Sequence, residues 1–500
     1  MNLKKLSVLA AVALLAIPSF AQYKDDAPSG GTVNLTLEDA LKIALSENVS
    51  VKVADMEIQR QEYARKGAYS ALFPQINASG MYSYALKKQK VYFGSDRTDG
   101  EESSGGGMAD MMAGIMAPIM YYIDELYKGT GVPFVPYVNP DPGQGSSSSS
   151  EPMEMGRSHS VSAGITAGMP VVNFQLWESL KLSGDQVELA VEKARESRLG
   201  MVTSVKQAYF GVLFAKEAYK VYESVYENAV ENFRLTEMRY NAQKASELDF
   251  TRAKSNVAAA IPNLYNSENA MELALWQLKA VMGIDLESDI DVAGTLTDYA
   301  GEMLVNMDDA ANASLDGNTT LRQLAQQAEM LSRQIRMQQY AYLPTLSLSF
   351  SYSYLTQSDI FNLSQWRWFP SSTVGLSLSI PIFSGGQRLR TIQQTRVQAD
   401  ELELQRVNTE RQIRIGIRQS LGTMDTAVRT YDASREALAS AEKAYDIATE
   451  SYRLGKSTLT DLNNTELVLT QSRLAVSQAV YNYVLAKAGL EQTLGYDFND

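Results

Sequence analysis

The residues able to do chemistry in this sequence are few in kind, although acidic residues are numerous. His159 is the only histidine and cysteine is absent, so the chain offers no Ser-His-Asp triad, no histidine-rich metal site and no thiolate ligand. Phosphate-binding loops and dinucleotide fingerprints are missing as well. The 58 acidic residues follow polar helical patterns, for which a solvated face is the ordinary interpretation. The sequence therefore predicts a protein that is not an enzyme and has no cofactor.

A group of methionines is the one remaining candidate for metal binding. Met108, Met112, Met116 and Met120 recur at helical spacing, with Met111 between them. Thioether sulfur suits Cu(I), so a copper site is one interpretation. The other is an amphipathic loop helix that uses methionine as flexible apolar filler, and this is the interpretation we favour.

The first residues indicate an exported protein. Lys4 and Lys5 precede an apolar run and a small-residue cleavage pattern at 19–21, which predicts a signal peptide over residues 1–21. The run is too short for a transmembrane helix, and no later segment has about 20 consecutive apolar residues. The formal net charge of −13 argues against nucleic-acid binding, which needs a basic surface.

An internal duplication organises the rest of the chain. A shift of 212 residues pairs Tyr240 with Tyr452, and the match extends along both flanks. Nearer the start of each copy a shift of 270 pairs Asn48 with Asn318, because the first copy carries an insertion with loop composition. We therefore predict a first repeat over 22–283 with a long loop at 86–157, an acidic equatorial segment between the repeats over 284–317, and a second repeat over 318–500.

Each repeat contains two segments in which apolar and polar residues alternate. Between Pro344 and Tyr354, large apolar residues interleave with serines, which predicts a strand with one face for lipid and one that carries hydroxyls. Trp177 and Trp366 flank such strands, as residues at a membrane interface do. The edge of a soluble sandwich is the alternative. Four strands cannot close a barrel, whereas three chains with four each would give 12, an allowed even number. The predicted strands cover about 75–85, 160–170, 345–355 and 374–382.

The longest patterns in the sequence are helical and too long for a globule. An apolar stripe from Val202 to Phe233 advances by three or four positions each time, a mean step near 3.5 that favours helices coiled around neighbours. Two stretches of about 67 residues would each be roughly 100 Å long. A shorter return helix follows each one, so we predict hairpins over 174–283 and 387–496. Helices at about 50–73 and 319–342 would stack on the return helices. Tyr219 and Tyr431 are interpreted as packing residues.

Together these features resemble the TolC-type family of outer-membrane efflux proteins over essentially the whole mature chain. The resemblance is carried by Ala-x-x-Pro at Ala71–Pro74 and Ala341–Pro344, by Pro381-Ile-Phe-Ser-Gly-Gly386, and by the hairpin tip from Tyr452 to Asp461. It implies a mostly α fold with a small transmembrane β part. In a homotrimer, coiled-coil hairpins would form a periplasmic α-barrel, and four strands from each protomer would complete a 12-stranded β-barrel in the outer membrane.

The resemblance further implies what such a protein does. It would be the passive duct of a tripartite efflux or type I secretion system, through which small molecules leave the cell. Its partners would be a periplasmic adaptor protein, an inner-membrane pump reached through that adaptor, and the lipid of the outer membrane. The alternative is a non-pore periplasmic coiled-coil structural or adaptor protein, and a secreted hydrolase is a third possibility.

By position, the resemblance also implies functional residues at the two hairpin tips. Copy one departs from the family pattern at Gln243, which stands where copy two has Gly455, so its tip is expected to dock the adaptor more weakly. The adaptor-docking tip would comprise Asn241, Ala242, Gln243 and Lys244 of copy one, with Arg453, Leu454, Gly455 and Lys456 of copy two. The periplasmic aperture would include Asp461, Asn464 and Asp249.

Asp461 has two interpretations. Three symmetry copies of Asp461 near one axis would form an acidic ring, which favours cations and raises the pKa of each carboxyl group. Alternatively, Asp461 is an acid at a helix N-terminus that interacts with the helix dipole. Asn464 stands one turn further on, at the position where the family places a second carboxylate.

Overall fold

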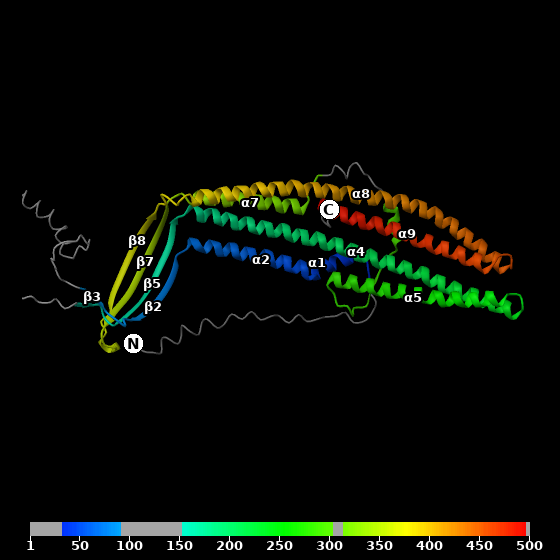
Figure 1. Cartoon of the computed structure of the whole chain (residues 1–500), viewed down its shortest axis with the longest axis horizontal. Coiled ribbons are helices and arrows are strands. Elements are labelled where there is room, and N and C mark those ends of the chain that lie inside the picture. Colours follow the sequence, from blue (N-terminus) through cyan, green and yellow to red (C-terminus); the bar gives the residue numbers. More distant parts are fainter. Residues whose placement is uncertain (1–32, 92–152, 304–313, 497–500) are drawn as a thin grey trace, which may run out of the picture. The chain divides into compact units, whose positions relative to one another are not determined.

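The computed structural model describes residues 33–91, 153–303 and 314–496, which form two units (Figure 1). The helical unit comprises the described parts of Met1–Lys66, Glu178–Gln338 and Gln387–Asp500. The sheet unit comprises the described parts of Gly67–Trp177 and Gln339–Gly386. The predicted signal peptide and the methionines at 108, 111, 112, 116 and 120 lie outside the described residues.

The helical unit is made mainly of long helices and the sheet unit mainly of strands. The helices are α1 (Leu37–Glu47), α2 (Val49–Tyr69), α4 (Phe174–Asn241), α5 (Glu247–Met282), α7 (Thr319–Tyr340), α8 (Gln387–Arg453) and α9 (Leu459–Leu494). Short 3-10 helices are η2 (Ser70–Leu72), η3 (Leu296–Glu302) and η4 (Leu363–Gln365). The strands are β1 (Val33–Leu35), β2 (Gln75–Tyr84), β3 (Gln89–Val91), β4 (Met153–Met155), β5 (His159–Val172), β6 (Ile290–Val292), β7 (Thr345–Ser358) and β8 (Phe369–Ser379). None of the helices in the described ranges is both long and apolar enough to cross a membrane.

The sheet unit is built on one antiparallel sheet of four strands in the order β2-β5-β7-β8. Because side chains alternate between the two faces of a strand, the register places Ile76, Ala167, Phe350 and Val374 in one row on one face. The next row, on the opposite face, is Asn77, Thr166, Ser351 and Thr373. One face is therefore apolar and the other carries hydroxyls and amides, as the alternating sequence predicted. The apolar face is exposed in the single chain, since Ile76 and Val374 are 71% and 72% accessible.

The helical unit consists of two long hairpins, α4 with α5 and α8 with α9, together with the shorter α1, α2 and α7. Its main core includes Val205 and Tyr209 of α4, Leu278 of α5, Leu421 of α8 and Val480 of α9. The stripe of apolar residues in α4 is buried from Val202 to Val212 and again at Ala229, and its other members are half-buried. At 1.5 Å per residue, the 68 residues of α4 and the 67 of α8 are each roughly 100 Å long.

One asparagine in each repeat joins a return helix to a short helix. The amide nitrogen of Asn48 donates to the carbonyl of Val281 near the end of α5, at 2.7 Å, and its oxygen accepts from the amide of Ser50. The amide nitrogen of Asn318 donates to the carbonyl of Thr493 near the end of α9, also at 2.7 Å. The oxygen of Asn318 caps the start of α7. Each asparagine therefore satisfies the ends of two helices, and the predicted stacking of short helices on return helices is present in both repeats.

A small parallel pair, β1 with β6, lies against the middle of α4. The hydroxyl of Tyr209 donates to the carbonyl of Ala293, at 2.7 Å, and Lys216 donates to the carbonyl of Val292. Glu217 accepts from the amide of Leu296 and from the hydroxyl of Ser477 on α9. The segment between the repeats is thereby bound to both hairpins of the chain.

Several predicted boundaries are wrong. The fourth strand was placed at about 374–382, but β8 runs from Phe369 to Ser379, because Pro381 has no amide hydrogen to continue the ladder. Pro370 is tolerated inside β8 since this strand is at the edge of the sheet. The loop predicted at 86–157 contains β3 and β4, which pair with each other. Neither α1 nor the pairing of β1 with β6 was predicted.

We expect Asn318→Ala to destabilise the helical unit by about 1–3 kcal/mol, because it leaves a helix-end carbonyl and a helix-start amide without their side-chain partner. Asn48→Ala should cost a similar amount at the equivalent joint in the first repeat. Chemical denaturation of the purified protein, with α7 and α9 followed by hydrogen exchange, measures the effect. An Asn318→Ala protein whose amides at the start of α7 exchange as slowly as in the wild type would contradict this role.

Candidate functional site

The two hairpin tips turn with the same backbone geometry. In copy one, the amide of Lys244 donates to the carbonyl of Arg239 and the amide of Gln243 donates to that of Tyr240, at 2.7 and 2.9 Å. In copy two, Lys456 donates to Ser451 and Gly455 donates to Tyr452, at 2.8 and 2.9 Å. This is the Schellman arrangement, which ends a helix with one residue in the left-handed region.

The residue in the left-handed region differs between the copies. Gly455 has φ of 75°, and Gln243 has φ of 56° in spite of its side chain. Glycine adopts this conformation freely, whereas a residue with a Cβ atom is strained there by roughly 1–2 kcal/mol. The departure of Gln243 from the family pattern therefore leaves the turn unchanged and stores strain in it.

Asp249 and Asp461 occupy equivalent places at the starts of the return helices. The hydroxyl of Thr458 accepts from the amide of Asp461, at 3.2 Å, while the carboxylate of Asp461 accepts from both the hydroxyl and the amide of Thr458. This is a capping box. Ser246 and Asp249 make the corresponding side-chain contacts in copy one. Both carboxylates thus do the work of helix N-terminal acids.

The hydrogen bonds from Thr458 hold the pKa of Asp461 below its usual range. The carboxyl group is consequently ionised at neutral pH, and its side chain is exposed to water. Asn464, one turn further along α9, is also exposed, whereas Asp249 is half-buried. A capping carboxylate of this kind is still available as a charge to ions in solution.

A clamp between the two hairpins lies just above the tips. The guanidinium of Arg239, in the last turn of α4, donates to the carbonyls of Tyr452 and Arg453 at 2.8 and 2.6 Å. It also lies over the ring of Tyr452, 4.8 Å from the ring centre. The hydroxyls of Tyr452 and Thr236 are 2.6 Å apart and form a buried hydrogen bond. We call Thr236, Arg239 and Tyr452 the tip clamp, since they tie the end of α8 to the end of α4.

The sequence did not predict the tip clamp. A basic residue in the last turn of α4 is a common signal for interaction with carbonyls at a helix end, but those carbonyls are ordinarily its own. Here Arg239 binds the end of a different helix, 213 and 214 residues away. Only the pairing of the hairpins in space brings these groups together.

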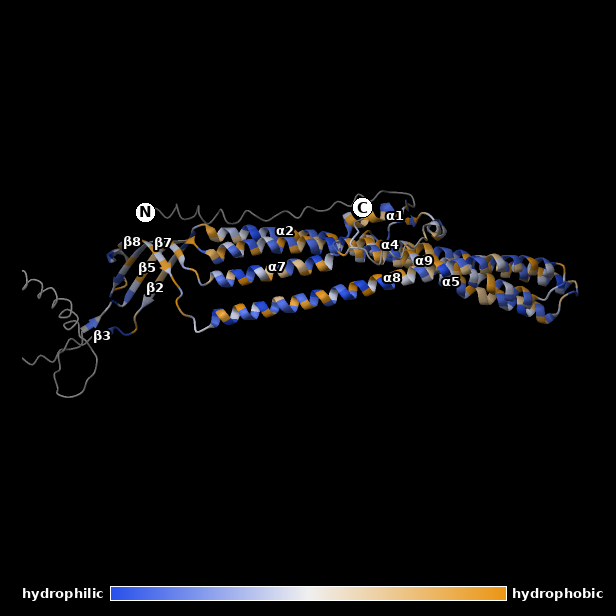
Figure 2. Cartoon of the chain, turned by 90° about the horizontal axis from the view of Figure 1, so that it is seen from above, coloured by the Kyte–Doolittle hydropathy of each residue, from blue (hydrophilic) through white to orange (hydrophobic). Residues whose placement is uncertain are grey.

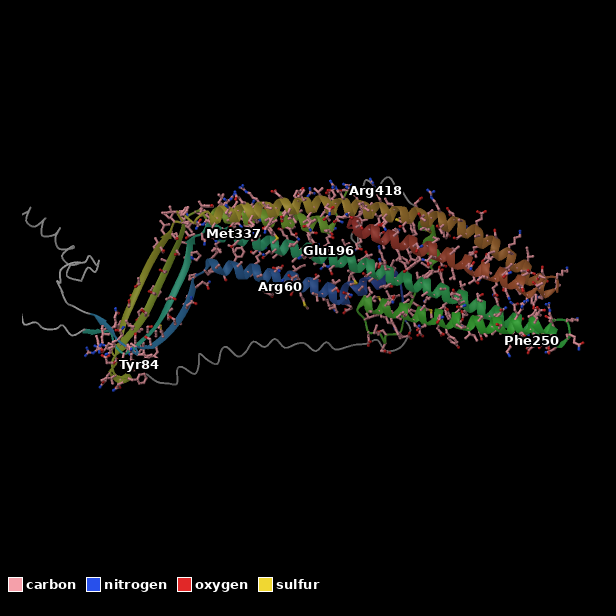
Figure 3. The ribbon with its side chains drawn as sticks, viewed as in Figure 1. Arg60, Tyr84, Glu196, Phe250, Met337 and Arg418 are labelled. Carbon is pink, nitrogen blue, oxygen red and sulfur yellow. The ribbon has the colours of Figure 1, made fainter. Side chains whose placement is uncertain are left out.

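The tip of the first hairpin is further packed by aromatic rings. Phe250 on α5, labelled in Figure 3, stacks on Tyr240 with ring centres 5.0 Å apart and contacts Phe233 at 5.6 Å. All eight residues predicted to dock an adaptor are exposed. The exposed residues are Asn241, Ala242, Gln243, Lys244, Arg453, Leu454, Gly455 and Lys456. The structure therefore presents them on two neighbouring turns of one unit.

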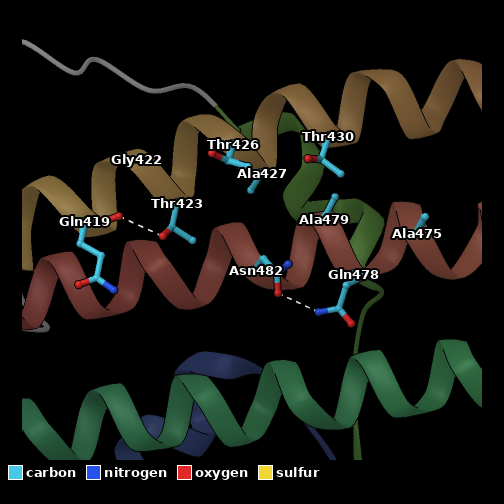
Figure 4. A pocket seen from close by; sticks show the side chains of 10 residues that line it. All are labelled: Gln419, Gly422, Thr423, Thr426, Ala427, Thr430, Ala475, Gln478, Ala479 and Asn482. Carbon is cyan, nitrogen blue, oxygen red and sulfur yellow. Dashed lines mark hydrogen bonds between the residues drawn. The ribbon is translucent and has the colours of Figure 1, made fainter.

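A hollow of about 560 Å³ opens between α8 and α9, further from the tips (Figure 4). Its lining is uncharged and consists mainly of short side chains. Gln478 bonds to Asn482 at 2.8 Å, and the hydroxyl of Thr423 donates to the carbonyl of Gln419. The lining residues are Gln419, Gly422, Thr423, Thr426, Ala427, Thr430, Ala475, Gln478, Ala479 and Asn482.

Comparison with known proteins gives a consistent answer. The family model described as outer membrane efflux protein matches residues 125–284 and 310–496. The chain is 22% identical over 354 residues to the outer membrane protein TolC of Escherichia coli strain K12, a match that covers 68% of this chain and 70% of that protein. It is 26% identical over 311 residues to the pyoverdine export outer membrane protein OpmQ of Pseudomonas aeruginosa, covering 59% of this chain and 61% of that protein.

Solved structures show the same fold. The Campylobacter jejuni CmeC outer membrane channel superposes with a TM-score of 0.67 at 17% identity, covering 96% of this chain and 93% of that one. The structure of CusC gives 0.63 at 15% identity, covering 95% and 96%.

The strain at Gln243 yields a matched pair of substitutions. Gln243→Gly should stabilise the first tip by about 1 kcal/mol, and Gly455→Gln should destabilise the second by about the same amount, because each exchanges a strained residue and glycine at one left-handed position. Hydrogen exchange of the amides in the last turns of α4 and α8 measures both. The two variants shifting exchange in the same direction would rule out this explanation.

Proposed function

The chain belongs to the outer membrane efflux protein family, and on that premise we propose that it is one of three identical protomers of a passive export duct. The duct serves a tripartite efflux or type I secretion system and carries small molecules across the periplasm and the outer membrane. The family is one of channels rather than enzymes, and its relatives are outer membrane proteins. A signal peptide over residues 1–21 directs export and is removed.

The observation that carries the proposal is the four-stranded sheet. In the sheet as described, β2 and β8 each pair on one side only, so two rows of backbone groups are left for other chains. Unpaired backbone groups cost several kcal/mol each in hydrocarbon. Three copies that pair β2 of one with β8 of the next would form a closed barrel of 12 strands, an even number of the allowed kind. The apolar row of Ile76, Phe350 and Val374 faces lipid in that barrel.

The surface of the helical unit supports assembly with further copies. Val53, Met56 and Tyr63 on α2, with Leu389 and Leu404 on α8, are between 51% and 71% accessible. Hydrophobic residues recur along both helices in Figure 2. Side chains of this size are normally buried, and a row of them on a long helix is typical of an interface. In a trimer, neighbouring copies cover them and the hairpins complete a tubular wall.

The tips supply the contact with a periplasmic adaptor and, through it, with an inner-membrane pump. Arg453, Leu454, Gly455 and Lys456 present two cations, an apolar side chain and a glycine turn together. The equivalent turn of copy one, Asn241 to Lys244, carries one cation and has the same backbone shape. The uncharged hollow between α8 and α9 offers helices of the adaptor a second surface, since its short side chains permit close approach.

The periplasmic aperture lies where the capped ends of the return helices approach the threefold axis. Asp461 is ionised at neutral pH, so three copies form an acidic ring that favours cations. Asn464 and Asp249 line the same opening. The capping and the ring interpretations of Asp461 are compatible, because the capping box fixes the carboxylate in place. The tip clamp holds the hairpins in the closed arrangement, and its release allows α8 and α9 to move outward.

The proposed duct is tested by conductance. The purified protein should run as a trimer in mild detergent and give stepwise conductance with cation preference in planar bilayers. Asp461→Ala should reduce that preference, because it removes three charges from the aperture, while Glu436→Ala on the exposed side of α8 should not. A water-soluble monomer without channel activity would refute the proposal and favour the non-pore coiled-coil alternative.

A second experiment tests the clamp. Arg239→Ala removes two hydrogen bonds from a charged donor, each worth about 1.5–3 kcal/mol, so we expect the closed-to-open ratio to fall by roughly 100-fold or more. Single-channel recording measures the open fraction. Arg234→Ala is the matched control, because Arg234 pairs only with Glu231 on its own helix among the contacts described. Equal open fractions in the two variants would show that the clamp does not control opening.

A further inference from the structure

A half-buried carboxyl group lies in a cavity between the two hairpins. Glu466 is on α9, and its Oε1 atom is shielded from solvent and makes no hydrogen bond within the described part of the chain. The cavity of about 190 Å³ is lined from α4, α5 and α9, that is, from both hairpins. Neither the aperture nor the docking tip uses this residue.

The lining of the cavity combines polar and apolar side chains and carries no cation. Glu466 is its only charged residue, and the polar side chains around it are Asn232, Asn256, Asn263 and Asn463. The rest of the lining is Val225, Ala229, Ala253, Ala259, Ala260 and Leu459. A cavity of this size holds water, and its amides provide the polar partners that ordered water needs. A negative charge there, however, has no opposite charge beside it.

The groups around Glu466 come from α4, α5, α8 and α9. Asn228 of α4 and Tyr445 of α8 are polar neighbours of its carboxyl group, and both favour the charged form and so lower the pKa of Glu466. Burial acts in the opposite direction and is the larger effect, so the pKa of Glu466 is raised above its ordinary value of 4.5. Burial, together with the nearby charge of Glu466, raises the pKa of Tyr445 to about 12, so this hydroxyl stays neutral.

The remaining charges nearby do not neutralise Glu466. The guanidinium of Arg473, on the same face of α9, lies 3.6 Å from the carboxylate of Glu442 on α8. Its charge lowers the pKa of Tyr445. The charge of Asp446 on α8 raises the pKa of Tyr445, as the charge of Glu466 does. The residues that α4 and α5 contribute to the cavity are all uncharged. Protonation is therefore the available way to remove the charge while the hairpins stay packed.

We propose that Glu466 is a proton-binding site whose occupancy sets how tightly α9 packs against α4 and α5 near the tips. The sign follows from linkage. Below the ordinary pKa of 4.5 the carboxyl group is neutral in both the packed and the separated arrangement, and packing is fully favoured. Above pH 4.5 the carboxyl group of the separated arrangement loses its proton before that of the packed arrangement does. The free energy of packing therefore becomes less favourable as the pH rises through the higher pKa of the packed state. Packing near the tips thus tightens in acid and loosens toward neutral and alkaline pH.

This role is independent of the proposed function, because it concerns two hairpins of one chain and holds whether or not the tips contact an adaptor. It also differs from the tip clamp, which shares no residue with the lining of this cavity. A proton site of this kind would make the spacing of the hairpins respond to the pH of the surrounding compartment.

A pair of spin labels measures the distance between α5 and α9 directly. The chain has no cysteine, so Ser255→Cys on α5 and Val468→Cys on α9, both at exposed positions, give labels at these two sites alone. In the full-length assembled protein, we expect a short and narrow distance distribution at pH 4.5 that broadens toward longer distances by pH 8. Glu466→Gln keeps the shape of the side chain and its neutral state, so its distribution should stay narrow at every pH. Glu436→Gln, an exposed acid on α8, should keep the response of the wild type.

A second variant guards against a fold defect in Glu466→Gln. Asn463→Asp adds another carboxyl group to the same cavity, and like charges oppose each other's ionisation, so the midpoint of the transition should move to higher pH. A response that persists unchanged in Glu466→Gln, or a midpoint unmoved by Asn463→Asp, would overturn the proposal. Since channel conductance is a separate measurement, loss of this response leaves the export function standing, and loss of conductance leaves this site standing.

Discussion

Backbone groups in hydrocarbon have no water to bind, and this constraint governs what the chain must do with its four strands. Among the described residues, the order β2-β5-β7-β8 leaves one side of β2 and one side of β8 unpaired, and the apolar face that carries Phe350 and Val374 is exposed. A soluble sheet would hide that face under helices or a second sheet. In the proposed assembly, both needs are met at once by further copies of the same chain and by lipid.

The same reasoning applies to the helices, with water in place of lipid. A helix of 68 residues cannot bury its apolar stripe against one short neighbour, so the chain uses pairs of rods joined end to end. Asn48 and Asn318 make this possible, because each closes the carbonyl end of one helix and starts the next. At each joint, a short helix continues the line of a return helix, so the two together approach the length of one long helix. The chain outside these stacked helices is then available to form β1 and β6.

Much of this fold could be predicted because the governing patterns are local and repeated. The bounds of α4, α5, α8 and α9 follow from apolar spacing and from cap residues such as Ser246 and Thr458. The start of β8 could not be predicted, since Pro370 reads as a break and only its place at the sheet edge makes it harmless. Neither could the tip clamp or the surroundings of Glu466, because both join helices more than 200 residues apart in sequence. For the predicted docking residues, the sequence indicated that they lie at the two hairpin tips. The strain at Gln243 could be recognised only from its backbone angle in the structure.

The two hairpins are not equivalent, because the two copies differ at several positions that pair under the duplication. Under the shift of 212 residues, Thr236 and Arg239 of copy one correspond to Ala448 and Ser451 of copy two, which have neither a long cation nor a bulky hydroxyl side chain. Copy two therefore cannot clamp Tyr240 in the way that copy one clamps Tyr452, and Tyr240 stacks on Phe250 of its own hairpin instead. Glu466 corresponds to Lys254, an exposed residue, so the cavity between the hairpins has its acid from one copy only. After duplication, the first hairpin kept the side chains that bind across to its neighbour, and the second supplies the tyrosine and the helix-end carbonyls that they bind.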